Sequence, residues 1–385
     1  MGLLPGSALT PGLIESIVLL GASLPFAQAA DVLAHFTGVR VGADTVRRLT
    51  ERVGAVHVDQ ETAAVAELER ALPDEPRGPA VQVLSVDGAM VPLVGGEWRE
   101  VKTLAVGEVV GTAAGPRTVA LSYCARCTDA ATFGHLATAE THRRGTRTAG
   151  TVVAVADGAV WCQGFVDLHR PDAVRILDFP HAVEHLGAVA QAVFGPGTAG
   201  ASEWLGVQAH RLRHGQEDAV LATLAALGAR AGLRAETRAL ADQTHGYLAT
   251  RREHIRYAAF AAAGYPIGSG CVESATKLVV EARLKGPGMH WARANVDPLL
   301  ALRTLLANDR WTEAWPAVWR HLCATARVRR IAPPAVPPPA QPRPAPPPDP
   351  ASAAPAVAPR PKTIVDGKPT AAHPWKRFSG QHAKP

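Results

Sequence analysis

Two short apolar segments, each followed directly by Asp-Gly, constrain the fold of this chain more than any other feature. Residues 81–86 (VQVLSV) precede Asp87-Gly88, and residues 151–156 (TVVAVA) precede Asp157-Gly158. Their length and valine content favour strands. A strand that is apolar at consecutive positions is buried on both faces, so it belongs to a sheet that helices cover. The sequence therefore predicts an α/β fold in which each aspartate ends a strand and begins a turn.

The neighbouring segments complete this sheet. Two further strands are expected over 98–110 and 117–123, a helix over 132–144, and a fifth strand over 173–177 that ends on Asp178. The order is three strands, a helix, a strand, and then a strand and a helix. Such an order predicts a mixed sheet between layers of helices.

The second half of the sequence is mainly helical. Residues 182–262 are rich in Ala, Leu and Arg and are expected to form helices throughout. A glycine-rich turn at 264–270 interrupts them, and a helix over 271–284 follows. Glu273 stands in the first turn of that helix, where a helix start orients a side chain rigidly.

The N-terminal region has a helix–turn–helix-like pattern. Short helices are expected over 11–20, 25–36 and 44–53, with a further helix over 60–72. The third would act as the recognition helix and present Arg47, Arg48 and Arg52 to DNA. A three-helix bundle without any DNA-binding role is compatible with the same pattern.

Charge and composition set the ends of the expected domains. Residues 332–385 are rich in Pro and Ala and hold seven Lys and Arg against two Asp and Glu, whereas the other 331 residues hold 33 against 32. Polyproline-type composition cannot support a helix or a sheet ladder. We therefore expect an N-terminal helical region (1–78), an α/β domain (79–331) with a helical insertion at about 190–262, and a disordered basic tail (332–385).

Composition also excludes some classes of protein. No run of about 18 apolar residues is present, and the start lacks the basic segment of a signal peptide. The five cysteines form no paired framework, which suits reduced thiols. The sequence predicts a cytoplasmic protein without a membrane partner.

Carboxylates carry the expected chemistry. Asp87 and Asp157 stand at the carboxyl ends of two buried strands, where α/β sheets gather their ligands. Carboxylates that share a site need a compensating positive charge, and a divalent cation with oxygen ligands supplies it. Glu273 is the third candidate. Asp178, which also ends a strand, is an alternative to Asp157 as the second carboxylate.

Several stretches of the chain resemble one family of proteins. The sequence is similar to bacterial insertion-sequence DDE transposases, specifically the ISKra-type group near the mutator-like transposases. The resemblance runs from the N-terminal helical region to the tail, and it rests on residues 86–93 (VDGAMVPL), 97–102 (EWREVK), 156–161 (ADGAVW), 176–182 (ILDFPHA), 268–274 (GSGCVES) and 366–370 (DGKPT).

The resemblance implies a fold and a reaction. The α/β domain would be a ribonuclease-H-like core with a helical insertion, and Asp87, Asp157 and Glu273 match the family's acidic triad. The triad would bind two Mg²⁺ ions, for which Mn²⁺ can substitute, and support in-line phosphodiester transfer. The enzyme would cut the terminal inverted repeats and join the 3′-hydroxyl to target DNA. A homo-oligomeric synaptic complex at the bacterial nucleoid is also implied.

Other residues have weaker signals. Basic residues and a tryptophan after Glu273 suit contacts to a DNA end, namely Lys277, Lys285, Trp291 and Arg293. His181 follows Asp178 and is expected near the active site. Cys124 and Cys127 have zinc-ligand spacing, but without a second cysteine pair we interpret them as incidental thiols.

Two other functions remain open from the sequence. One is a ribonuclease-H-like nuclease that cuts DNA without strand transfer. The other is a non-catalytic DNA-binding regulator that uses residues 1–55, which would not need three carboxylates at strand ends and a helix start. Inverted repeats flanking the gene would favour the transposase.

Overall fold

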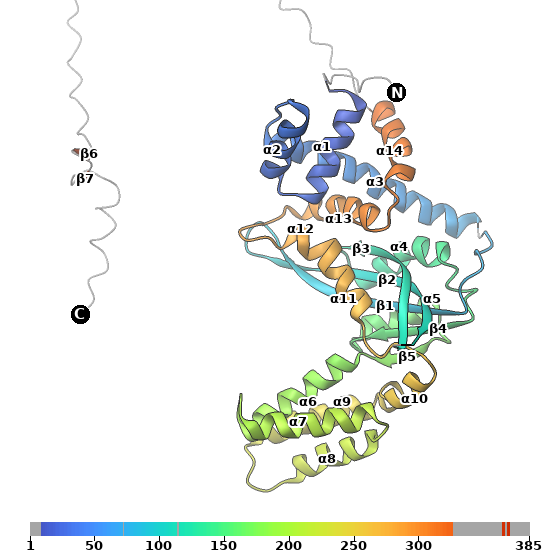
Figure 1. Ribbon diagram of the computed structural model, residues 1–385, viewed down its shortest axis with the longest axis vertical. Coiled ribbons are helices and arrows are strands. Elements are labelled where there is room, and N and C mark those ends of the chain that lie inside the picture. The colour runs from blue at the N-terminus through green and yellow to red at the C-terminus, as the bar shows by residue number, and fades with distance from the viewer. Residues whose placement is uncertain (1–8, 72, 114, 326–363, 366–367, 370–385) are drawn as a thin grey trace, which may run out of the picture. The chain divides into compact units, whose positions relative to one another are not determined.

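A five-stranded mixed sheet organises the first of the two units into which the chain divides, residues 1–329 and 330–385 (Figure 1). The computed structural model describes residues 9–71, 73–113, 115–325, 364–365 and 368–369. The sheet order is β3-β2-β1-β4-β5, in which β1, β2 and β3 are antiparallel and β4 and β5 run parallel to β1. The strands are β1 (Val81–Pro92), β2 (Trp98–Thr112), β3 (Gly115–Arg126), β4 (Thr151–Ala156) and β5 (Val174–Leu177).

Strand β1 is longer than the sequence indicates. The prediction that it ends in a turn at Asp87-Gly88 is wrong, because Asp87 pairs with Thr103 and Gly88 with Lys102 in an antiparallel ladder that continues to Pro92. Asp-Gly is an ordinary turn signal. Here the long neighbouring strand β2 supplies hydrogen-bond partners that keep the backbone extended.

Two helices cover one face of the sheet. They are α4 (Ala130–Arg143) and α5 (Val160–His169), and their buried Phe133 and Phe165 pack against Leu84, Val86 and Leu104. Helix α5, between β4 and β5, was not expected from the sequence. Its ten residues lie close to the lower limit of what periodicity detects.

The opposite face is covered in two parts. Over β1 to β3 lies a helical segment made of α11 (Gly270–Ala275), a π-helical turn (Thr276–Glu281) and α12 (Ala282–Leu284), together with α13 (Arg293–Ala307). Over β4 and β5 lies the helical insertion. Val83 and Ala89 of β1 each contact one of these two layers, and their even spacing places both layers on one face.

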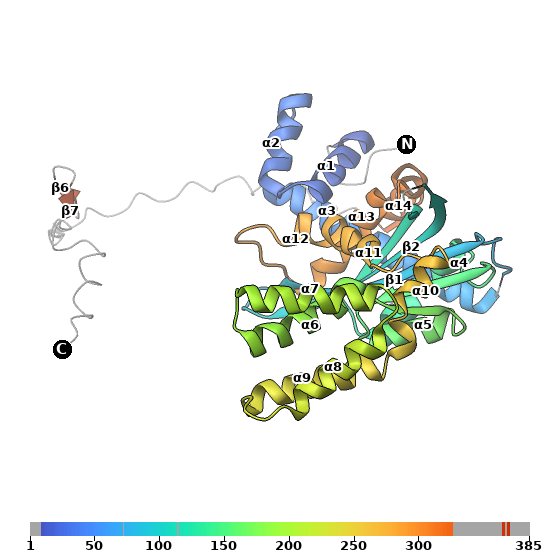
Figure 2. The same cartoon turned by 60° about the horizontal axis from the view of Figure 1, so that its bottom comes forward.

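The helical insertion forms a lobe beside the sheet (Figures 1 and 2). Its buried Leu212, Leu224 and Leu248 share one core with Val153 and Ile176 of the sheet. It follows β5 directly and so begins earlier than the expected residue 190. Its helices are α6 (Phe179–Phe194), α7 (Ala199–Arg213), α8 (Glu217–Ala229), α9 (Ala235–Ala249) and α10 (Tyr257–Ala262), with a 3₁₀ turn at Arg252–His254.

The N-terminal helices are α1 (Pro11–Ser23), α2 (Phe26–Thr37) and α3 (Ala43–Ala71). The prediction of separate helices over 44–53 and 60–72 is wrong, because α3 is continuous through both. At Gly54 this helix approaches α13 so closely that a Cβ would lie 2.6 Å from the carbonyl carbon of Pro298.

The N-terminal helices share a core with the end of the first unit. Ile14, Val18 and Val53 pack against Leu302 and against α14 (Trp311–Thr325), which contributes Trp315, Trp319 and Leu322. The expected boundary at residue 78 therefore separates no independent unit, since residues 1–329 cluster together.

The tail predicted to be disordered, 332–385, lies outside the described residues except for two short strands. These are β6 (Ile364–Val365) and β7 (Lys368–Pro369), which pair antiparallel.

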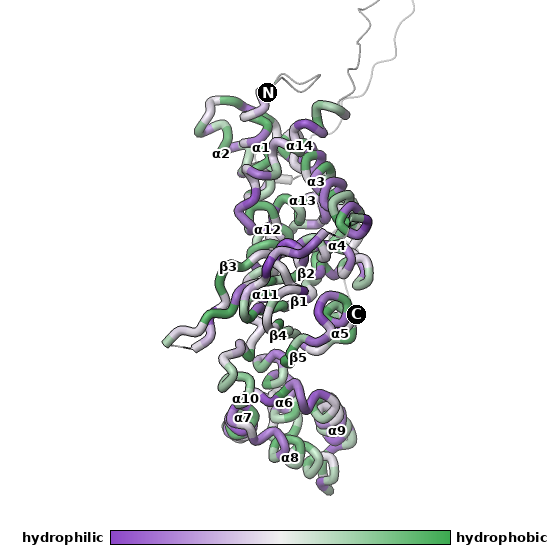
Figure 3. Tube along the Cα trace, turned by 90° about the vertical axis from the view of Figure 1, so that its right-hand side faces the viewer, coloured by the Kyte–Doolittle hydropathy of each residue, from purple (hydrophilic) through white to green (hydrophobic). Residues whose placement is uncertain are grey.

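The helices contain both hydrophobic and hydrophilic residues along their length (Figure 3). Among the described residues, no helix combines the length and the apolar character needed to cross a membrane.

Candidate active site

Asp87 lies within β1, and Asp157 occupies the corresponding position just after the parallel neighbour β4. The last pair that joins β1 to β4 is Ser85 with Val155, and each aspartate follows two residues later. Asp157 is the first residue after β4, and its Oδ1 accepts hydrogen bonds from the Ala159 amide (2.9 Å) and the Cys162 thiol (3.4 Å). The Asp87 Oδ1 accepts one from the Gly88 amide at 2.7 Å. The parallel register therefore brings these two distant aspartates side by side, where β4 ends and β1 continues.

Glu273, on α11, lies near Asp87 on the face of the sheet that this helix covers. Its neighbours Val272 and Ala275 are buried against the sheet, so the Glu273 side chain points outward and is exposed. The Ser269 hydroxyl donates a hydrogen bond to Glu273 Oε1 at 3.2 Å. A π-helical turn follows immediately, a rare conformation that is often found at functional sites. No sequence pattern indicated it.

The pKa of Asp87 is raised partly by the charges of the other two candidate carboxylates. Burial raises this pKa above its ordinary value, and the negative charges of Asp157, Glu273 and Glu100 raise it further, against a lowering by the Gly88 amide. Glu100 was not expected near the site. Its carboxylate forms an ion pair with the buried Lys102, at 2.6 Å.

The chemistry of the donors fits a magnesium ion, since all three candidates offer hard carboxylate oxygens, and burial and neighbouring carboxylates disfavour the charge on Asp87 unless a cation compensates it. Their present arrangement is looser than a ligand sphere. Among the side chains that the structure describes, no three from His, Cys, Asp or Glu converge closely enough to hold a metal ion.

Asp178, the alternative to Asp157, is engaged in backbone hydrogen bonds. It caps α6, where its Oδ2 accepts from the His181 amide at 2.9 Å, and its Oδ1 accepts from the Ser269 amide at 2.6 Å. The residue is 4% exposed. Both oxygens therefore fix the turn that precedes Glu273. This geometry favours Asp157 as the second ligand and gives Asp178 a supporting role.

His181 lies two side chains away from Asp157. Its Nε2 is 3.3 Å from Nε2 of His185, and the His185 ring stacks on Tyr247 with centroids 4.4 Å apart. The Tyr247 hydroxyl in turn donates to the Asp157 carbonyl oxygen. Burial lowers the pKa of His185. No sequence signal pointed to Tyr247, which comes from the middle of a long helical stretch.

The predicted recognition arginines stand near the start of α3. Arg47 pairs with Asp44 and Glu51, at 2.5 and 3.0 Å, and Arg48 pairs with Asp44 at 2.9 Å. Arg52 is exposed. The two acidic neighbours reduce the positive charge that Arg47 and Arg48 present.

The basic residues after Glu273 divide into two groups. Lys277, Lys285 and Arg293 are exposed, and Lys285 also pairs with Glu281 at 2.8 Å. Trp291 is different, because it is 7% exposed and its indole donates to the Leu284 carbonyl at 3.0 Å. The prediction that Trp291 stacks on a base is therefore wrong. Its ring belongs to the core, with the Arg283 guanidinium 5.0 Å from its centroid.

The cysteines at zinc-ligand spacing are both buried thiols. Burial raises the pKa of Cys124 to about 12 and also raises the pKa of Cys127. Zinc binds thiolates. This environment favours packing over metal binding for Cys124 and Cys127.

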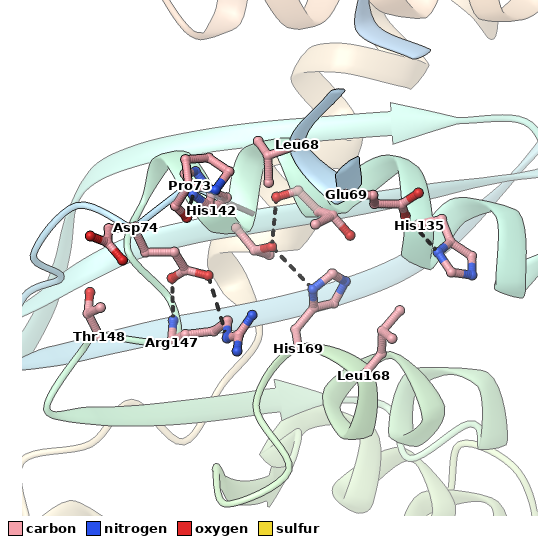
Figure 4. Close-up of a pocket in the computed structure, with 13 residues that line it drawn as sticks. Leu68, Glu69, Pro73, Asp74, His135, His142, Arg147, Thr148, Leu168 and His169 are labelled. Carbon is pink, nitrogen blue, oxygen red and sulfur yellow. Dashed lines mark hydrogen bonds and ion pairs between the residues drawn. The ribbon is translucent and has the colours of Figure 1, made fainter. Parts of the chain in front are cut away.

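A cavity of about 700 Å³ lies elsewhere, between residues 73–75 and helices α4 and α5 (Figure 4). Its histidine and arginine side chains are engaged by the protein itself. His169 contacts the Thr141 hydroxyl and the Gly134 carbonyl, both at 3.1 Å, and Arg147 contacts Glu75. Burial lowers the pKa of His169 to about 4. None of the three candidate carboxylates lines this cavity. We interpret it as a gap between packed segments.

Comparison with known proteins adds no family to this geometry. No protein-family model matches the chain, and no curated protein matches it. The function proposed below is therefore argued from the site and from the sequence motifs.

Proposed function

We propose that this chain is a DDE transposase of an insertion sequence, which cuts the ends of its element and joins the freed 3′-hydroxyl to target DNA. One observation carries the proposal. Asp87, Asp157 and Glu273, which the motifs single out, come from a central strand, the turn after its parallel neighbour and a later helix, and the charges of Asp157 and Glu273 act on Asp87.

The order of elements supports a ribonuclease-H-like core. Three antiparallel strands, a helix, a parallel strand and a further strand follow one another from β1 to β5. The helical insertion then separates β5 from α11, the helix that carries Glu273. This is the arrangement that the resemblance to DDE transposases leads us to expect.

Each carboxylate has a distinct support. Asp87 is held in a paired strand, Asp157 in the turn that begins α5, and Glu273 by the Ser269 hydroxyl. Together they would hold two Mg²⁺ ions, or Mn²⁺, which when bound stabilise the charge on the transferring phosphate. Lys277, one helical turn beyond Glu273, is exposed and suited to a backbone phosphate of the DNA end.

The remaining parts of the proposal concern partners. The exposed Arg48 and Arg52 on α3 would contact the terminal inverted repeats, and two DNA ends require a homo-oligomer in a synaptic complex. Such a complex would act in the cytoplasm, at the nucleoid.

The test is a cleavage and strand-transfer assay on the DNA that flanks the gene. Asp157→Asn should lower end cleavage about a hundredfold or more, because a metal ligand contributes several kcal/mol to transition-state stabilisation. DNA binding should be retained. Asp167→Asn is a matched control, since Asp167 is an exposed aspartate on α5 that pairs with Arg175.

The outcomes separate the competing functions. Cleavage at the wild-type rate by Asp157→Asn contradicts the proposed triad. Cleavage by the wild-type protein without joined products indicates a nuclease. Specific binding without any cleavage indicates a DNA-binding regulator.

A further inference from the structure

The helical insertion contacts the main chain of the candidate active site at the turn formed by Asp157 and Gly158. The Tyr247 hydroxyl, on α9, donates to the Asp157 carbonyl oxygen at 2.5 Å. The Arg251 Nη2, just after α9, donates to the Gly158 carbonyl oxygen at 3.0 Å. These residues lie 90 and 93 positions away along the chain, so only the fold brings them here.

The turn and the two side chains fit each other closely. Gly158 has a φ of +81°, a conformation that favours glycine. A Cβ at this position would lie 2.7 Å from the Tyr247 hydroxyl oxygen and 2.9 Å from the Arg251 Nε. Gly158 therefore serves two needs, the turn after β4 and the close approach of Tyr247 and Arg251.

Tyr247 and Arg251 are themselves held in place. The Arg251 guanidinium lies 4.0 Å from the centroid of the Tyr247 ring, and its Nη1 donates to the Tyr247 carbonyl at 3.1 Å. The His185 ring also stacks on Tyr247. These contacts restrict both side chains before any substrate binds.

We infer that Tyr247 and Arg251 are positioning residues for Asp157, which makes the helical insertion part of the active site. Asp157 follows Ala156, the last residue of β4, whose carbonyl oxygen still accepts from the Asp178 amide at 2.8 Å, whereas the carbonyls of Asp157 and Gly158 are held by the insertion. The two donors hold the consecutive carbonyls of Asp157 and Gly158, and together with the Ala159 amide on Oδ1 they set the direction of the Asp157 carboxylate. The inference rests on the proposed function, in which Asp157 is a metal ligand.

The experiment measures binding of Mn²⁺ alone to the full-length protein by titration calorimetry. Tyr247→Phe keeps the ring that stacks on His185 and removes only the hydroxyl. We expect its Mn²⁺ affinity to fall about three- to tenfold, the value of one net hydrogen bond. The Mg²⁺ concentration that gives half-maximal cleavage should rise by the same factor, while the affinity for DNA stays unchanged.

Two matched controls separate positioning from general stability. Tyr257→Phe removes the same kind of bond, from a buried hydroxyl to the Leu177 carbonyl at 2.9 Å, at the end of β5. Arg252→Gln removes a neighbouring exposed arginine that pairs with Asp218, as a control for Arg251→Gln. Both controls should keep wild-type Mn²⁺ affinity, even where thermal stability falls. Gly158→Ala should weaken Mn²⁺ binding as Tyr247→Phe does.

The outcomes of this experiment are distinct from those of the proposed function. If Asp157→Asn binds Mn²⁺ as the wild type does, the proposed function fails whatever the other variants show. If Asp157→Asn loses Mn²⁺ binding and Tyr247→Phe keeps wild-type affinity and half-saturation, only the positioning role is overturned. A loss of affinity in Tyr257→Phe equal to that in Tyr247→Phe also overturns it.

Discussion

The two helical regions that flank the sheet in sequence differ in what they contact. The insertion α6–α10 packs directly on β4 and β5 and reaches the backbone at Asp157 and Gly158. The N-terminal helices α1–α3 pack mainly on one another and on α13 and α14. Figures 1 and 2 place the two regions at opposite ends of this unit. One helical region therefore contacts the candidate site, and the other packs on the helices around the sheet. Amino-acid composition does not distinguish the two regions.

A buried arginine links the N-terminal helices to the helical segment that carries Glu273 and ends at Leu284. The Arg283 side chain is 2% exposed, and it donates twice to the Gly21 carbonyl, at 3.2 and 3.1 Å. Its guanidinium also lies 4.5 Å from the centroid of the Phe26 ring. The N-terminal region thus contacts the helix of Glu273 at its far end, whereas the insertion contacts the turn of Asp157 itself.

Removal of the insertion should have the largest effect. Replacing residues 190–262 with a short Gly-Ser linker would expose Val153, Val155 and Ile176, which its leucines now cover. We expect loss of the cooperative unfolding transition. An ordinary domain is stable by only about 5–15 kcal/mol, and losing the core that the insertion shares with the sheet should exceed this margin. Thermal unfolding followed by circular dichroism checks this. A soluble truncated protein with a sharp transition would contradict the shared core.

Core truncations at the two ends should separate stability from metal binding. Trp319→Ala, in the N-terminal core, should lower the free energy of unfolding by about 3–5 kcal/mol and leave Mn²⁺ affinity unchanged. Leu248→Ala should cost about 2–5 kcal/mol and also weaken Mn²⁺ binding, because Leu248 follows Tyr247 on α9. Urea unfolding and titration calorimetry measure the two effects. Weaker Mn²⁺ binding by folded Trp319→Ala would show that the core around Trp319 also affects the candidate metal site.

The exposed arginines of α3 should affect DNA preference alone. The double variant Arg48→Ala and Arg52→Ala should reduce the preference for the element's terminal repeat over random DNA by about 1–3 kcal/mol for each base that these arginines recognise. Mn²⁺ affinity should stay at the wild-type value. Competition binding at two salt concentrations measures this, with Arg252→Ala on the insertion as the control. An unchanged preference would move sequence recognition away from α3.

Two aspartates should respond to pH in opposite directions, and this is the smallest expected effect. Asp87 has a raised pKa, so its ionised form is penalised in the folded protein and stability is lost as pH rises through that pKa. Asp87→Asn should therefore unfold at a higher temperature than the wild type at pH 7. The difference should vanish below about pH 3, where the carboxyl is protonated in both states.

Asp44 in the N-terminal region provides the contrast. The hydrogen bond from Arg47 lowers the pKa of this exposed carboxyl, so its contribution to stability is present at pH 7 and is lost as pH falls through the lowered pKa. Asp44→Asn should therefore be slightly less stable than the wild type at pH 7. Thermal melts from pH 3 to 7 measure both variants. Destabilisation by both at pH 7 would contradict the raised pKa of Asp87.

Local pattern alone predicted much of the sheet and its candidate ligands. Apolar runs with strand-like composition located β1, β4 and β5, and the Asp-Gly pairs and the glycine-rich turn pointed to Asp87, Asp157 and Glu273. At two positions the local pattern gave the wrong prediction, because a contact with a distant segment decides the structure there. Asp87-Gly88 reads as a turn, but pairing with β2 keeps it extended. Trp291 reads as an exposed aromatic among basic residues, but it packs in the core beside Arg283.

The sequence by itself determined which residues are chemically equipped for this site, because carboxylates, glycines and strand formers are local properties of the chain. Only the tertiary structure decided which of them meet. The parallel register aligns Asp87 with Asp157, and α9 supplies Tyr247 and Arg251 to a turn some 90 residues away. Asp157 and Asp178 look alike in sequence, and they differ because the backbone amides of His181 and Ser269 occupy both oxygens of Asp178. Contacts between distant segments depend on packing geometry, which no local pattern encodes.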